Sequence, residues 1–137
     1  MRIIALDVGD RMVGVAVSDP DGLIAQPYAS LKRDQEIFER VSDIAKGLKA
    51  EKIIVGMPMK MDGTEGLEAI KVREFAAELE KKTGIPVDFV DERLSTKEAE
   101  RTMKEMKAPL YRAKEMSHSI AASLFLRKYL ESGEGNA

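Results

Sequence analysis

The sequence predicts an α/β fold: a five-stranded mixed sheet with helices on both faces. Two features of its 137 residues predict this fold. First, three apolar runs follow one another through short turns near the amino terminus, which is typical of antiparallel strands. Second, helical patterns then alternate with short apolar runs, so the later strands should be reached by right-handed crossovers. The first, fourth and fifth strands are therefore expected to be parallel.

The three antiparallel strands are expected at residues 2–7, 12–18 and 23–28. The first two are rich in β-branched and apolar residues, and the short gap at residues 9–11 indicates a hairpin between them. Residues 19–22 read Asp-Pro-Asp-Gly, a strong turn signal, and the strand after them has the weakest pattern of the three.

The rest of the chain alternates between helices and strands, apart from one loop. The pattern predicts a helix through 37–48 with Asp34 as N-cap, a strand at 52–55 closed by Gly56, a loop at 57–66, a helix at 67–83 with Gly84 as C-cap, a strand at 86–90, a helix from a capping box at 95–98 to Pro109, and a helix at 113–131. No repeat or linker interrupts this order. We therefore expect one domain at 1–131 and a disordered tail at 132–137.

Composition limits the chemistry. The chain has no cysteine, which excludes disulfides and thiolate metal sites, and its single histidine excludes a zinc site built from several histidines. Metal chemistry must then rest on carboxylates, which favours Mg²⁺ or Mn²⁺. No apolar run reaches the roughly 18 residues of a membrane span, and no signal peptide is recognisable, so we expect no membrane partner and a cytoplasmic location.

The charge of the chain is uneven. The net charge of −2 argues mildly against a nucleic-acid partner. Basic residues nevertheless outnumber acidic ones within 97–128, where Lys114 is one of them. This segment forms either two solvated helix faces or a basic rim.

Acidic residues gather at one edge of the predicted sheet. Asp7 ends the first strand, and Asp91 and Glu92 follow the fifth. Parallel strands bring their carboxyl ends to the same edge, so these carboxylates should converge. Like charges repel, and such a cluster is stable only with a cation or a raised pKa. The cluster predicts a metal site; the alternative is that Asp7 caps a turn and the other two form a polar loop.

Three further residues are candidates. Arg93 either orients Asp91 or binds a phosphate, and Ser95 either starts a helix or contacts substrate. His118 shares its helix face with Ala121 and Ala122. Small residues on that face would let the helix approach the sheet, which would bring His118 near the sheet edge. The alternative is a lone helix histidine that bonds polar groups of the core.

Four motifs resemble the YqgF (RuvX) family, and the match covers nearly the whole chain except the tail. They are Asp7-Val8-Gly9 with residues 14–19, Gly56-Met57-Pro58 with Asp62-Gly63-Thr64, residues 91–96 (Asp-Glu-Arg-Leu-Ser-Thr), and Ala121-Ala122 with Leu126 and Tyr129-Leu130. The resemblance implies a ribonuclease H-like fold, a relation to Holliday-junction resolvases, and a role in maturing the 5′ end of precursor 16S ribosomal RNA on the pre-ribosome. It also implies phosphodiester hydrolysis with one or two Mg²⁺ or Mn²⁺ ions.

The resemblance also assigns roles to residues. The catalytic metal ligands would be Asp7, Glu92 and a residue of the last helix, where this chain has His118 in place of the family's usual aspartate. Residues that support the site or contact substrate would be Asp91, Arg93, Ser95, Gly9, Arg11 and Lys114. The chain also departs from the family at residues 10–12, where Asp-Arg-Met replaces a usual Thr-Lys-Arg, so one basic substrate contact would be lost.

Three alternative functions remain. The first is cleavage of branched DNA such as a four-way junction. That reaction would need a homodimer, whereas the sequence allows either a monomer or a homodimer. A non-catalytic RNA-binding or assembly factor is the second alternative, because of the replacement at His118. An actin-like sugar-kinase half is the third, since Asp-x-Gly also begins that phosphate-binding motif. The short chain and the lack of a second such motif disfavour the kinase.

Overall fold

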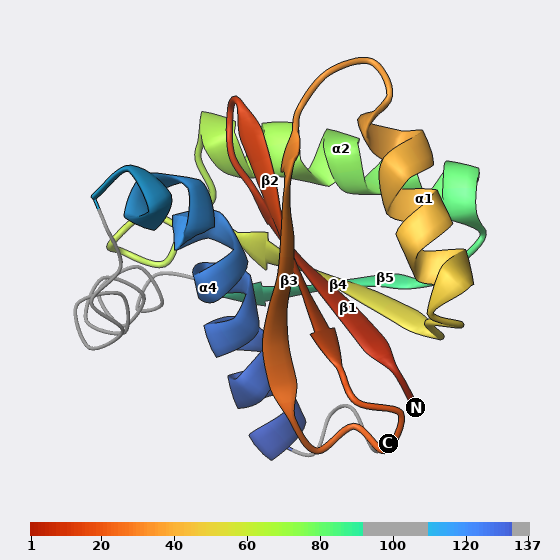
Figure 1. Ribbon diagram of the computed structural model, residues 1–137. Coiled ribbons are helices and arrows are strands. Elements are labelled where there is room, and N and C mark those ends of the chain that lie inside the picture. The colour runs from red at the N-terminus through yellow and green to blue at the C-terminus, as the bar shows by residue number, and fades with distance from the viewer. Residues whose placement is uncertain (92–109, 133–137) are drawn as a thin grey trace.

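A computed structural model describes residues 1–91 and 110–132 of the chain. Its sheet has five strands in the order β3-β2-β1-β4-β5 (Figure 1). The strands are β1 (Ile3–Val8), β2 (Met12–Ser18), β3 (Ala25–Lys32), β4 (Lys52–Met57) and β5 (Val87–Asp91). β1, β2 and β3 are antiparallel neighbours, whereas β1, β4 and β5 run parallel. This confirms the predicted mixed sheet.

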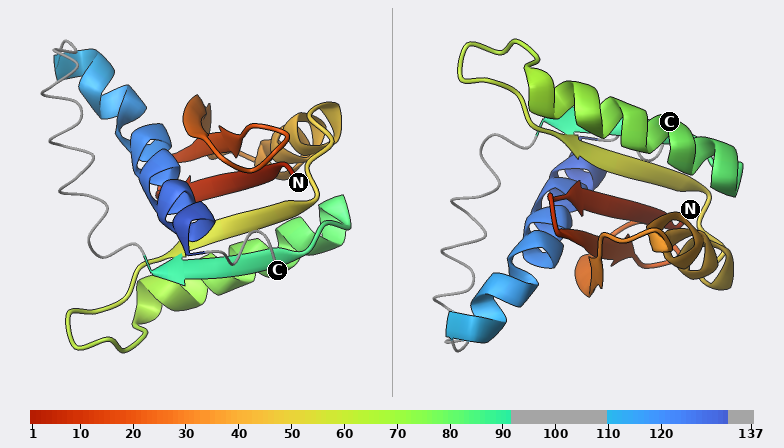
Figure 2. Two further views of the ribbon diagram at one scale, coloured as in Figure 1. Left: turned by 90° about the horizontal axis from the view of Figure 1, so that it is seen from below. Right: turned by 90° about the horizontal axis from the view of Figure 1, so that it is seen from above.

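Helices cover both faces of the sheet, as expected (Figures 1 and 2). Helices α1 (Ile37–Gly47) and α2 (Leu67–Thr83) pack on one face, and α4 (Leu110–Glu131) crosses the other. Successive strand residues point to opposite faces, so each face has its own apolar core. Ile4 and Leu6 of β1 belong to the α1/α2 core, whereas Ile3 and Ala5 belong to the α4 core. Asp7 continues the second series and therefore faces α4.

The third strand is present, but its bounds differ from those predicted, and the predicted N-cap of the first helix is wrong. β3 begins at Ala25 because the turn carboxylate of Asp19 accepts the backbone N–H groups of Leu23 and Ile24, at 2.7 and 2.8 Å. β3 then continues to Lys32, which pairs with Met12. The N-cap of α1 is Glu36.

Asp34 lies two residues before that cap. Its side chain accepts the N–H of Glu36 at 3.0 Å and so closes the turn that precedes α1. The wrong cap prediction therefore has a local cause: an aspartate can bond to the backbone two residues on outside a helix as well as at its start.

Other boundaries shift by a few residues. β4 extends through Met57, past the predicted end at 55, and α4 begins at Leu110, earlier than the predicted 113. The bounds of α2 are confirmed, with Gly84 as its left-handed C-cap at φ 71°. Ser132 is bonded to the end of α4 through the carbonyl of Tyr129, at 2.7 Å. The helix predicted from 95 and the tail at 133–137 lie outside the described residues.

Candidate active site

Two side chains from opposite ends of the chain meet at the carboxyl edge of the sheet. The imidazole Nδ1 of His118, on α4, lies 2.7 Å from Oδ2 of Asp7, near the end of β1. The Asp7 side chain is 14% exposed and that of His118 is 35% exposed. The pair is therefore partly shielded from water but remains reachable. The structure thus brings together two of the three predicted metal ligands.

A glycine in β2 lets the helix come this close. Gly14 pairs directly with Asp7 across the β1–β2 ladder. A Cβ atom on Gly14 would lie 2.1 Å from the carbonyl carbon of His118 and 2.3 Å from the amide nitrogen of Ser119. The backbone of α4 therefore rests directly on β2 at this point, and no other residue type fits there.

Sequence reasoning missed the role of Gly14. It attributed the close approach to Ala121 and Ala122, of which only Ala122 packs into the core beneath the sheet. The available signal was a glycine inside a strand, which often marks the close approach of another backbone.

The bond to Asp7 changes the protonation of His118. It raises the pKa of the imidazole above its ordinary value of 6.5, and charge attraction by Asp7 adds to this while burial opposes it. The protonated ring donates to the carboxylate and cancels its charge. A cation at Asp7 would therefore compete with the proton on His118.

The pair lines an open pocket of about 570 Å³ at the carboxyl edge. The turn after β1 contributes Gly9, Asp10 and Arg11 to this pocket, and Pro58 and Glu68 form the other side. A Cβ on Gly9 would lie 2.7 Å from Cε1 of His118, so this glycine leaves room for the imidazole. The structure thus places the predicted residues Gly9 and Arg11 beside the pair.

Arg33, which was not predicted, supports this turn from behind. Its Nη1 donates to the carbonyl of Gly9 at 2.9 Å, and its backbone N–H donates to the carbonyl of Arg11 at 2.8 Å. Its guanidinium also lies 5.2 Å from the ring centroid of Phe75 in α2. Arg33 therefore ties the pocket wall to the helical layer. The local sequence around Arg33 does not predict contacts with such distant segments.

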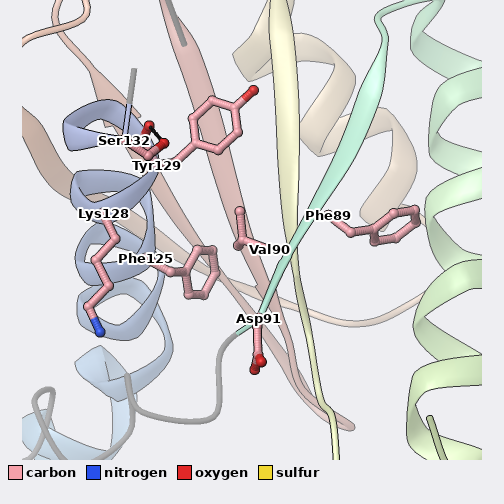
Figure 3. A pocket seen from close by; sticks show the side chains of 7 residues that line it. All are labelled: Phe89, Val90, Asp91, Phe125, Lys128, Tyr129 and Ser132. Carbon is pink, nitrogen blue, oxygen red and sulfur yellow. Dashed lines mark hydrogen bonds between the residues drawn. The ribbon is translucent and has the colours of Figure 1, made fainter. Parts of the chain in front are cut away.

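Asp91 lies away from this pocket. It ends β5 and lines a smaller pocket of about 290 Å³ between β5 and α4, together with Phe125 and Lys128 (Figure 3). The side chain of Lys114 and all of Glu92, Arg93 and Ser95 lie outside the described part of the chain.

The described side chains do not complete a metal site. Within that part of the chain, no three acidic or histidine residues are grouped so that they could hold a metal ion. Asp7 and His118 supply two donors, and a third would have to come from beyond the described residues. Among those described, no helix combines the length and apolarity needed to cross a membrane.

Comparison with known proteins identifies relatives along nearly the whole chain. A family model described as RuvX, Holliday junction resolvase, matches residues 1–132. The "Putative pre-16S rRNA nuclease" of Syntrophomonas wolfei is 41% identical, over 97% of this chain and 96% of the relative. The protein of the same name from Thermoanaerobacter pseudethanolicus is 44% identical, over 96% of this chain and 97% of the relative.

Solved structures agree on the fold. The fowlpox virus resolvase in complex with Holliday junction DNA aligns with a TM-score of 0.57 at 15% identity, over 96% of this chain and 98% of that chain. Thermus thermophilus RuvC with a Holliday junction substrate aligns at 0.52 and 14%, over 93% and 96%. These likenesses confirm the ribonuclease H-like fold. Together with the match of the family model over nearly the whole chain, they confirm the expected kinship: the chain belongs to the RuvX family.

Proposed function

We propose that the chain is a nuclease that hydrolyses phosphodiester bonds in RNA with the help of Mg²⁺ or Mn²⁺. Its substrate would be the 5′ end of precursor 16S ribosomal RNA, which implies a cytoplasmic location on the pre-ribosome. The observation that carries this proposal is the Asp7–His118 pair in an open pocket at the carboxyl edge of the sheet. The family match and the printed names of the relatives support it. One nuclease domain would span residues 1–131.

The donor chemistry of the pocket fits a divalent cation in part. Asp7 offers a carboxylate, whose Oδ2 bonds His118 and whose Oδ1 has no further protein partner among the described residues. Carboxylate oxygens suit Mg²⁺ and Mn²⁺, and imidazole is a common metal ligand once it is neutral. In this proposal Glu92 supplies the third ligand, as the resemblance of residues 91–96 to the family motif implies.

Each residue then has a defined task. Asp7, Glu92 and His118 would hold the cation. Asp91, at the end of β5 and separated from β1 by β4, would support Glu92, the next residue in the sequence. A bound divalent cation lowers the pKa of a water nucleophile and stabilises the leaving oxygen. His118 must release its proton before it can act as a ligand. The backbone phosphates of the substrate would be bound by Arg11, Arg93 and Lys114. Gly9 would leave room for the substrate, and Ser95 would contact it through its hydroxyl.

Branched DNA is the second candidate substrate. The family model's own description names a Holliday junction resolvase, which favours this alternative. Resolution of a four-way junction needs two cuts and therefore a dimer with two sites. A monomer would suffice for RNA trimming, so the mass of the active species separates the two candidates.

The test is cleavage of two labelled substrates: a 5′ segment of precursor 16S RNA and a DNA four-way junction. Each is incubated with Mn²⁺ or with EDTA, and the products are resolved by length. The proposal expects RNA cutting that EDTA abolishes. Cutting of the junction alone would favour the resolvase. RNA binding without any cutting of either substrate would contradict the nuclease and favour a binding factor.

A further inference from the structure

Strand β5 forms one edge of the sheet (Figure 2). In the described part of the chain, β4 is the only strand that pairs with it. The pairing with β4 is regular from Val87 to Asp91, without a shift of register. The outer side of a regular edge strand presents N–H and C=O groups to which a further strand can bond. The question is what controls access to this edge.

The opposite edge, β3, is unsuited to the addition of a strand. Pro27 lies in β3 and has no N–H group to donate. The register with β2 also shifts between Val15 and Ala16, which leaves Tyr28 as an extra residue in β3. Prolines and bulges commonly keep an edge strand from pairing. Residues 87–91 contain neither, so a different feature must protect β5.

The direction of the backbone groups shows which of them point outward from β5. The N–H of Ile53 in β4 donates to the carbonyl of Pro86 at 3.0 Å. Backbone groups alternate in direction along a strand, so Asp88 also turns its N–H toward β4. Val87 and Phe89 therefore turn their N–H groups away from the sheet, toward the position of an added strand.

Carboxylates occupy both of these outward N–H groups. The N–H of Val87 donates to Oε1 of Glu80, near the end of α2, at 3.1 Å. The N–H of Phe89 donates to Oδ1 of Asp88 at 2.9 Å. A hydrogen bond to an ionised acceptor is stronger than one between neutral groups. An incoming strand would have to displace both carboxylates before it could bond to β5.

The carboxylate of Asp88 is held in this position from the interior. Its Oδ2 lies 3.6 Å from Nζ of Lys52 in β4. The same Nζ donates a hydrogen bond to the hydroxyl of Tyr129, a buried residue of α4. One oxygen of Asp88 is thus tied to the core through Lys52, while the other occupies the N–H of Phe89. The contact at the edge is therefore preorganised.

A second copy of β5 is a suitable strand for this edge. If two β5 strands pair antiparallel with the two Phe89 residues opposite each other, both aspartates of each strand lie opposite valines of the other copy. No two carboxylates then face each other directly, and such an isologous pair closes as a dimer. We propose that the outer edge of β5 is a self-association site for a second copy of this chain, and that Glu80 and Asp88 keep it closed. Self-association at this edge does not depend on the proposed nuclease function.

The experiment measures the mass of the protein by sedimentation over a range of concentrations. Glu80→Ala combined with Asp88→Ala removes both carboxylates, and Glu80→Ala alone removes the one that lies on the helix surface. Glu80→Gln combined with Asp88→Asn removes the charges but keeps an oxygen acceptor at each position. The matched control combines Glu78→Ala and Asp43→Ala, at exposed helix positions that make no bond within the described part of the chain. Circular dichroism first shows that each variant is folded.

The variant with both alanines should reach twice the wild-type mass as concentration rises. Its Val87 and Phe89 amides should become more protected from hydrogen exchange over the same range. Glu80→Ala alone should associate more weakly, because one outward N–H is still occupied. The variant with glutamine and asparagine and the matched control should both sediment as the wild type.

Three results would overturn this role of the two carboxylates. The first is a wild-type mass for both Glu80→Ala and the variant with two alanines at every concentration. The second is association without added protection of the Val87 and Phe89 amides, which would place the contact elsewhere. The third is association of the variant with glutamine and asparagine, which would show that charge and not the two hydrogen bonds keeps the chains apart.

Discussion

Asp7 and His118 stand 111 residues apart in the sequence, yet Oδ2 of one and Nδ1 of the other lie 2.7 Å apart. Asp7 comes from β1 and His118 from α4, and Gly14 of β2 lets the helix approach the sheet at this point. The hydrogen bond to Asp7 raises the pKa of His118, so the protonated ring neutralises the carboxylate; in the proposed function a cation would have to take the place of that proton. If that proposal holds, binding of the cation should strengthen as pH rises through the pKa of His118.

The titration of His118 provides a direct check of the pair. Because the chain has a single histidine, its ring signals in a proton NMR spectrum are unambiguous. We expect a pKa above 6.5 in the wild type, caused first by the hydrogen bond to Asp7. In Asp7→Asn the pKa should fall, since the carboxylate is gone. If a divalent ion binds at Asp7, Mn²⁺ should broaden the ring signals of His118 and Mg²⁺ should lower its pKa. An unchanged pKa of His118 in Asp7→Asn would contradict the hydrogen bond between the two residues.

The same pair makes stability depend on pH. A pKa raised in the folded state means that the folded protein binds the proton more tightly than the unfolded chain. The stabilisation is therefore fully present below pH 6.5 and is lost as pH rises through the raised pKa of His118. Urea unfolding of wild type and His118→Gln should show a difference in unfolding free energy that shrinks from pH 6 to pH 9. A difference that grows with pH would contradict the assignment.

Gly14→Ala should be severely destabilising. The added Cβ would lie 2.1 Å from the backbone of His118, so α4 must move away from β2. We expect a loss of about 3 kcal/mol or more, together with loss of cleavage. The matched control is Gly47→Ala at the end of α1, where a Cβ would meet no atom within 4 Å. That variant should be neutral or stabilised by roughly 0.5–1 kcal/mol. Denaturant unfolding distinguishes the two.

The sequence was most informative where local and tertiary forces agree. β2 and α2 have the predicted bounds because their apolar periodicity matches the core they face, and Gly84 ends α2 as a left-handed cap should. The start of β3 was predicted two residues too early because the Asp19 carboxylate accepts the backbone N–H groups of Leu23 and Ile24, which the pattern assigned to the strand. Hydrogen bonds from a side chain to the backbone leave no trace in the hydrophobic periodicity of the sequence, so the pattern could not reveal them.

The sequence predicted the positions of Asp7 and His118 but not the contact between them. Strand order alone places Asp7 at the carboxyl edge, and motif resemblance pointed to His118. Neither shows that the two bond directly, because that depends on how closely α4 crosses β2 at Gly14. Arg33 was missed because its partners, the carbonyl of Gly9 and the ring of Phe75, come from distant segments.

Arg33→Met should slow cleavage without unfolding the chain. The change removes the bond to the Gly9 carbonyl and keeps most of the apolar stem over Phe75. The turn beside Asp7 would then be held less firmly, and we expect a rate about tenfold lower. Arg40→Met is the matched control, since Arg40 pairs with Asp34 and Glu36 on the surface. Equal rates in the two variants would show that the turn needs no such support.

Tyr129→Phe should lower stability and leave cleavage intact. Tyr129 is 3% exposed, and its hydroxyl accepts a hydrogen bond from Nζ of Lys52, which raises the pKa of that lysine. Loss of the hydroxyl should cost about 1 kcal/mol, because Lys52 keeps Asp88 at 3.6 Å. Tyr28→Phe on β3, where the residue is 50% exposed, should cost almost nothing. Thermal unfolding compares them, and equal midpoints would contradict the role of the hydroxyl.

The central claim, that Asp7 holds the catalytic metal, is tested most directly by single-turnover cleavage of precursor 16S RNA. The enzymes compared are wild type, Asp7→Asn and Asp10→Asn, all with Mn²⁺ and all shown to be folded. Asp10 lies in the same pocket and serves as the matched acid. We predict that Asp7→Asn loses about three orders of magnitude in rate, whereas Asp10→Asn stays within about tenfold of wild type. Cleavage by Asp7→Asn at the wild-type rate would contradict the account.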